Sequence, residues 1–202
     1  MKKLCFTLVE LLITLVIIGV ISVITVPSLI NYTNGLEYKA AFKKAVSSVN
    51  QALKLNYTSE GTAAYDFEDS TDLVNNLFKK EMNVIEDDDT EFPGTEDSAC
   101  DGPTWMTTDG VIYCIKNFNP QDAEGNNSEV CNNQNTKPCG DPPNIYIDVN
   151  GEKTPNTVTV NSNSPKDIYY AVLYAQNVIP YGDAAQQVMY DDKKVTDSVS
   201  GS

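Results

Sequence analysis

The sequence predicts an α+β protein in which a long N-terminal helix, transmembrane in its first half, packs on a C-terminal antiparallel β-sheet. Two observations predict this fold. An apolar segment of twenty-five residues begins close to the N-terminus, and short apolar runs separated by Asn, Gly and Pro follow in the second half of the chain. The length of 202 residues fits one domain with an appendage.

Composition excludes several kinds of chemistry. All 14 basic side chains are Lys, because the chain has no Arg and no His, and 28 acids bring the net charge to −14. The lack of His excludes a Ser-His-Asp triad, a Cys-His dyad and a His-ligated zinc site. No pair of carboxylates can be assigned to acid and base roles, so we expect no enzyme. So acidic a surface also makes nucleic acid an unfavourable partner.

The apolar segment, residues 6–30, is long enough to cross a membrane. Glu10 is its only ionisable side chain, and as a helix it would measure roughly 37 Å against about 30 Å of hydrocarbon. Lys2 and Lys3 precede it, so we expect a cytoplasmic N-terminus and an exported remainder. A signal peptide is the alternative, but the segment is longer than a usual h-region and lacks a small-x-small cleavage site.

The helix is expected to continue through residues 31–60 as an amphipathic half that ends near residues 57–61. Apolar side chains recur there at steps of three and four residues, at Phe42, Ala45, Val46, Val49, Ala52 and Leu53. Gly19 and Pro27 weaken the backbone hydrogen bonds before this half, which predicts a kink or a hinge.

The charge of Glu10 needs a favourable interaction to offset its cost in lipid, because a carboxylate in a lipid-facing helix costs up to about 2.5 to 3.5 kcal/mol near the centre. One source is local: Thr7 and Glu10 have the spacing of a capping box. The other is an amine created by cleavage before Phe6, which would pair with the Glu10 of a neighbouring copy and set the register between identical helices. Both remain open from the sequence.

The residues LCFTLVELLITLVIIGVISVITVP resemble the N-terminal segment of type IV pilins and type II secretion pseudopilins. The resemblance implies a pilin-like fold, a leader of residues 1–5, cleavage by prepilin peptidase between Cys5 and Phe6, N-methylation of Phe6 and assembly through Glu10. It also implies a bacterial inner-membrane protein that an assembly platform builds into a homo- or hetero-oligomeric filament, periplasmic or extracellular.

One position departs from the family pattern, because Cys5 stands where the family has Gly. A small side chain can still enter the peptidase site. Only four residues precede Cys5, too few for the apolar region of a lipoprotein signal, so we expect no lipidation. The competing function is a single-pass anchor whose exported domain binds a ligand or partner. An exported hydrolase is a third alternative, because Asp109, Asp148 and other carboxylates are present, although no pair of them can be assigned.

The exported domain, residues 61–202, is expected to begin with a short helix over residues 69–82, capped by Ser70 or Thr71. Strands are expected at residues 111–115, 145–149, 157–160 and 168–175. The segment from Trp105 to Cys114 resembles a strand-turn-strand unit of pseudopilin domains, and residues 147–156 resemble a turn near their C-terminus.

Four cysteines in an exported domain favour disulfides. Three connectivities exist for Cys100, Cys114, Cys131 and Cys139, and short loops favour the first with the second and the third with the fourth. We expect no resident cofactor. Asp148, Asn150 and Glu152 alternate oxygen ligands as calcium loops do, but an Asn-Gly hairpin turn with an Asp cap explains the same residues better.

Overall fold

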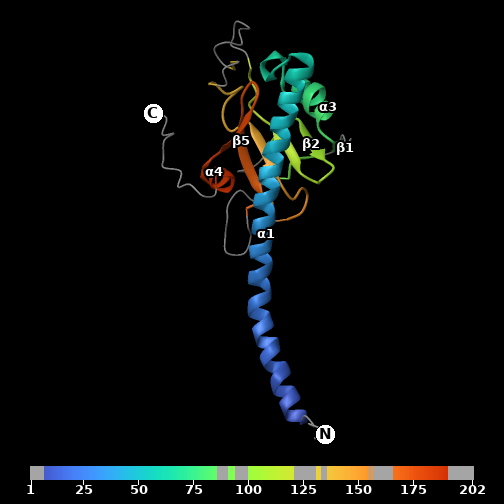
Figure 1. Ribbon diagram of the computed structural model, residues 1–202, viewed down its shortest axis with the longest axis vertical. Coiled ribbons are helices and arrows are strands. Elements are labelled where there is room, and N and C mark those ends of the chain that lie inside the picture. The colour runs from blue at the N-terminus through green and yellow to red at the C-terminus, as the bar shows by residue number, and fades with distance from the viewer. Residues whose placement is uncertain are drawn as a thin grey trace.

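The computed structural model describes residues 7–85, 91–93, 100–120, 131–132, 136–154, 156 and 166–190. A single long helix extends out of a globular α+β body, and most of its first half projects away from that body (Figure 1). The predicted α+β class, with an apolar N-terminal helix and a C-terminal antiparallel sheet, is confirmed.

Helix α1 runs without interruption from Leu8 to Glu60, a length of 53 residues. It passes through Pro27, whose missing N–H removes only one hydrogen bond of the ladder. Gly61 ends it in the left-handed conformation (φ 75°), where its N–H donates to the Tyr57 carbonyl. The predicted end of the helix is confirmed.

The second half of α1 packs on the sheet through the predicted apolar positions. These side chains are almost completely buried: Phe42, Ala45, Val46, Val49, Ala52 and Leu53. They follow the 3.6-residue period of the helix, so they form one stripe that faces the core. The ring of Phe42 stacks on Tyr169 of the sheet with centroids 4.4 Å apart.

The sheet has six antiparallel strands whose spatial order follows the sequence. They are β1 (Val84–Ile85), β2 (Thr104–Thr107), β3 (Ile112–Ile115), β4 (Ile145–Asp148), β5 (Ile168–Leu173) and β6 (Val178–Tyr181). β3 and β4 are buried along their whole length, as expected for the centre of a sheet with both faces covered. The expected strands at 111–115, 145–149 and 168–175 are confirmed with bounds shifted by one or two residues, and that at 157–160 lies outside the described residues.

The expected helix at residues 69–82 consists of α2 (Ser70–Leu73), a π-helical turn η2 (Val74–Phe78) and α3 (Lys79–Glu81). The predicted cap is wrong. Asp69, not Ser70 or Thr71, caps it, because its Oδ1 accepts from the N–H groups of Thr71 and Asp72 at 2.8 Å each. A 3-10 turn η1 (Ala64–Asp66) precedes this segment, and α4 (Asp183–Met189) follows β6.

Three parallel rings link this helical segment to the sheet. Phe78 of η2 stacks on Trp105 of β2 with centroids 4.9 Å apart, and Trp105 stacks on Tyr113 of β3 at 5.1 Å. The interplanar angles are 8° and 9°, and all three side chains are buried. Stacked rings add stability beyond their buried area, so this column connects η2, β2 and β3 into one core.

Candidate assembly surface

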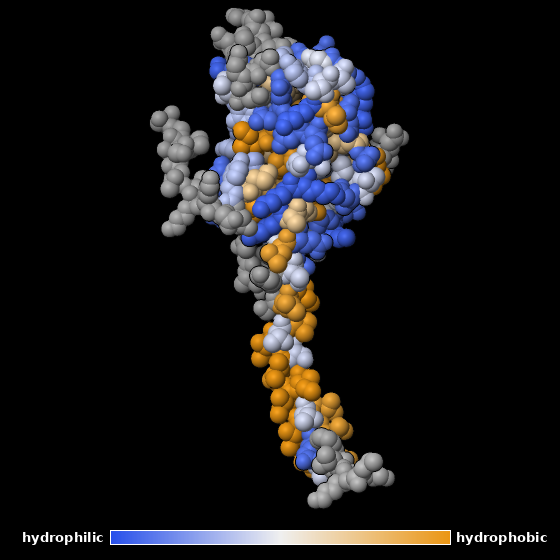
Figure 2. Space-filling model, viewed as in Figure 1, coloured by the Kyte–Doolittle hydropathy of each residue, from blue (hydrophilic) through white to orange (hydrophobic). Residues whose placement is uncertain are grey.

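The first half of α1 is the largest apolar surface of the described chain. Its apolar side chains from Leu8 to Ile30 are exposed, about half or more of each, and Leu8–Pro27 is long and apolar enough to cross a membrane. Figure 2 shows this stalk as a nearly continuous hydrophobic rod below a mostly hydrophilic body. Such a surface is not stable in water, so it requires lipid or other apolar helices around it.

Glu10 lies in the first turn of this apolar surface and is held by Thr7. The Thr7 N–H and hydroxyl donate to Glu10 Oε2 at 2.9 and 2.8 Å, and the Glu10 N–H donates to Thr7 Oγ1 at 3.3 Å. These contacts form the capping box that the sequence offered as the local compensation. Cys5 and Phe6, the residues of the expected cleavage site, lie outside the described residues.

Gly19 and Pro27, the expected hinge, both lie within the unbroken helix and on its exposed part. A Cβ added to Gly19 would meet no other atom within 4 Å, so no contact inside the subunit requires a glycine there. A requirement for glycine at position 19 would therefore come from atoms outside the described residues or from the conformation of the helix backbone.

Two disulfides fasten the segment before β2 and the segment between β3 and β4. Cys100 is joined to Cys114 of β3, and Cys131 is joined to Cys139. These are the pairs that short loops favoured in the sequence. The Cys139 N–H donates to the Leu173 carbonyl at 2.8 Å, so the second disulfide is also attached to the end of β5.

The three calcium candidates are not arranged around one point. Asp148 is fully buried and its Oδ1 accepts from the Asn150 N–H at 3.1 Å, whereas Glu152 is exposed. The Asn150 amide donates to the Tyr38 hydroxyl at 3.3 Å and thereby attaches the turn to α1. Within the described residues, no group of three or more His, Cys, Asp or Glu side chains is placed to hold a metal ion.

Burial has a marked effect on Asp148. Desolvation and the nearby Asp167 carboxylate raise its pKa to about 8. The side chain of Asp167 accepts from the Asn156 N–H at 2.7 Å, so both buried carboxyl groups support the loop between β4 and β5. This arrangement fits the hairpin interpretation of the DVNG segment.

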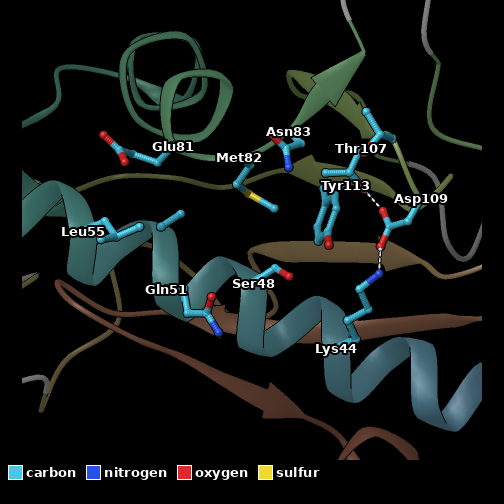
Figure 3. Close-up of a pocket in the computed structure, with 12 residues that line it drawn as sticks. Lys44, Ser48, Gln51, Leu55, Glu81, Met82, Asn83, Thr107, Asp109 and Tyr113 are labelled. Carbon is cyan, nitrogen blue, oxygen red and sulfur yellow. Dashed lines mark hydrogen bonds and ion pairs between the residues drawn. The ribbon is translucent and has the colours of Figure 1, made fainter.

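A cavity of about 240 Å³ lies between α1 and the β2–β3 turn, and sequence patterns did not indicate it. One wall is a row of α1 side chains, Lys44, Ser48, Gln51 and Leu55, and the other wall includes Met82, Asn83, Thr107 and Asp109 (Figure 3). Lys44 Nζ closes one end by pairing with Asp109 Oδ2 at 2.8 Å. The two residues are 65 positions apart, so no local motif could reveal the contact.

Asp109 is held as a carboxylate by its neighbours in the cavity. Partial burial alone would raise the pKa of Asp109, but Lys44 and the Thr107 hydroxyl, which donates at 2.5 Å, outweigh burial and hold the pKa below its usual value. Burial raises the pKa of Tyr113 at the cavity floor. The ion pair of Lys44 with Asp109 therefore closes the cavity at one end, while the Glu81 carboxylate lies elsewhere in its lining.

Comparison with protein-family models, with curated proteins and with solved structures finds no match to this chain. The candidate site therefore rests on the geometry described above. That geometry combines an exposed apolar helix, one carboxylate in its first turn and a folded domain rigidly continuous with it.

Proposed function

We propose that this protein is a structural subunit of a type IV pilus or a type II secretion pseudopilus. In this proposal prepilin peptidase removes residues 1–5, the membrane holds the subunit through its apolar helix, and an assembly platform builds the processed subunits into a filament. The proposal rests on the resemblance of the N-terminal segment to that family and assigns the chain no catalysis.

One observation carries the proposal. The apolar half of α1 has no partner within the described chain, yet it continues as the same helix into the core of the globular domain. When copies leave the bilayer, lipid contacts of Leu8–Pro27 would be exchanged for contacts with neighbouring helices, which keeps the apolar area out of water. The globular domains then lie outside a helical core.

Glu10 supplies specificity in this proposal. Within one subunit Thr7 donates two hydrogen bonds to the carboxylate, which is enough for a monomer in the membrane. The amine of a processed Phe6 on an adjoining copy would add an opposite charge, and a buried charge must be paired to persist. Identical helices would then be held at one axial offset.

Intact-mass measurement and electron microscopy test the proposal together. The mature chain should begin at N-methylated Phe6, and Glu10→Ala should still enter the membrane but form no filaments. Thr14→Ala, a polar change on the same exposed helix, is the matched control and should assemble. Filaments built from chains that retain residues 1–5 would contradict the proposal.

The second candidate is a single-pass anchor for an exported binding domain. The capping box favours it, because Thr7 satisfies Glu10 without any other copy. In that case the extracted protein keeps Met1 to Cys5, and Glu10→Ala has no effect on the state of association.

A further inference from the structure

The part of α1 that lies on the globular domain presents basic side chains to solvent. Lys43 and Lys54 are exposed, and the half-buried Lys39 lies one turn before Lys43. Lys43 and Lys54 are separated by eleven residues, or about 16 Å along the helix, on the side opposite the buried stripe. Figure 2 shows hydrophilic residues over this part of the molecule.

These three lysines have no ion pair among the described residues. The pairs present there are Lys44 with Asp109, Lys80 with Glu60 and Lys116 with Asp101. The basic row, defined here as Lys39, Lys43 and Lys54, therefore carries charge that no described residue neutralises by an ion pair.

The rest of the domain carries the opposite charge. Residues 31–60 contain 4 Lys and 2 Glu, which gives 4 − 2 = +2, whereas residues 61–202 contain 8 Lys and 25 acids, which gives 8 − 25 = −17. Globular domains of that charge repel one another when they are brought side by side. A basic surface placed between acidic ones replaces part of this repulsion by attraction.

We propose that the basic row of α1 is the surface on which the acidic globular domain of a second copy docks. This inference rests on the proposed function, since it names a contact within the filament. Each lysine would replace a repulsion between domains by an attraction. The spacing of the three lysines along α1 would align the neighbouring domain with the helix. Attraction of this kind weakens as salt screens it.

Distance along the helix favours a second copy over a lipid surface. Lys43 follows Ile30, the last residue of the apolar segment, by 13 residues and Lys54 follows it by 24, or about 20 and 36 Å. The polar layer of a bilayer is only about 5 to 8 Å deep on each side. Headgroups therefore do not reach either lysine while the helix stands across the membrane.

Charge reversal of the full chain in its native assembly system tests the inference. Lys43→Glu with Lys54→Glu should lower filament yield at least tenfold, whereas Lys43→Arg with Lys54→Arg should assemble as the wild type does. The matched control is Lys79→Glu with Lys153→Glu, which makes the same change of net charge at exposed lysines outside α1 and should retain filaments. Wild-type yield should fall as salt rises.

A crosslinking experiment locates the partner without relying on folding of the reversed variant. A photoreactive benzoylphenylalanine at position 43 should crosslink to residues 61–202 of another copy within wild-type filaments. Crosslinks to lipid alone or within the same chain would overturn the inference, as would wild-type yield from the doubly reversed variant. Absence of filaments from the wild type would instead refute the proposed function.

Discussion

The side-chain amide of Asn50 forms two hydrogen bonds with the backbone of Val178. Asn50 Oδ1 accepts from the Val178 N–H at 2.7 Å, and its Nδ2 donates to the Val178 carbonyl at 3.2 Å. The amide therefore occupies the place that another strand would take beside β6. Backbone groups of successive residues in a strand point to opposite edges, so those of Val178 and Pro180 point to the same edge of β6. Pro180 has no N–H that could form a hydrogen bond at this edge.

Replacing this amide should loosen α1 from the sheet. Asn50→Ala removes two hydrogen bonds and leaves a partly buried backbone N–H without its acceptor, so we expect a loss of about 1 to 3 kcal/mol in the free energy of unfolding. Urea denaturation of the detergent-solubilised chain measures it. Gln51→Ala affects an exposed amide whose hydrogen bond among the described residues is to Ser47, so it should leave the midpoint nearly unchanged.

The disulfides should contribute according to the loops that they close. Cys100 and Cys114 are 14 residues apart and Cys131 and Cys139 are 8 apart. Chain entropy then predicts losses of about 3 and about 2.5 kcal/mol when each pair is changed to Ser. Urea midpoints of the two double variants, compared with the wild type under oxidising conditions, check the order, and a larger loss for the shorter loop would contradict it.

Stability should depend on pH through Asp148. Its pKa is raised to about 8 in the folded protein, whereas an unfolded Asp titrates near its ordinary value of 3.8. Between these values the folded state binds a proton that the unfolded state has lost. The contribution of Asp148 to the free energy of unfolding is therefore fully present below the unfolded-state pKa of 3.8 and is lost as pH rises through the folded-state pKa of about 8. The loss is at most about 1.4 kcal/mol per pH unit.

Asp148→Asn tests this dependence, because the amide keeps an acceptor for the Asn150 N–H and does not titrate. Its melting temperature between pH 5 and pH 8.5 should fall less than that of the wild type. Asp183→Asn, at an exposed position in α4, should retain the wild-type slope. A wild-type slope in Asp148→Asn would exclude this carboxyl group as the cause.

The stack of Phe78, Trp105 and Tyr113 should be the most sensitive part of the core to truncation. Trp105→Ala leaves a cavity between two rings, for which we expect a loss of about 3 to 5 kcal/mol, and Trp105→Phe should lose less because it keeps a ring. Thermal unfolding followed by far-ultraviolet circular dichroism measures both. Tyr181→Ala, at an exposed ring of β6, should stay within about 0.5 kcal/mol of the wild type.

Periodic patterns in the sequence were sufficient for the larger elements. The buried face of α1 was predicted residue by residue, because its apolar positions recur every three or four residues over about three turns. β3 and β4 were predicted because apolar residues fill them and turn residues bound them. The spacing of Thr7 and Glu10 indicated the capping box as one of two alternatives, and the structure contains it.

The elements that sequence reasoning missed lack such patterns. β1 has two residues, too few for a period, and β6 contains Pro180, which argues against a strand when read alone. The cavity beside Lys44 depends on Asp109 in a distant turn, so only the folded chain brings its walls together. Asp69 caps the helix in place of the expected Ser70 or Thr71, because its carboxylate accepts hydrogen bonds from two N–H groups of the first turn at once.

The continuity of α1 has a mechanical consequence. A helix of 53 residues spans about 80 Å, and no loop between Leu8 and Glu60 decouples its two ends. Torque applied to the apolar end of this helix is therefore transmitted along it to the globular body.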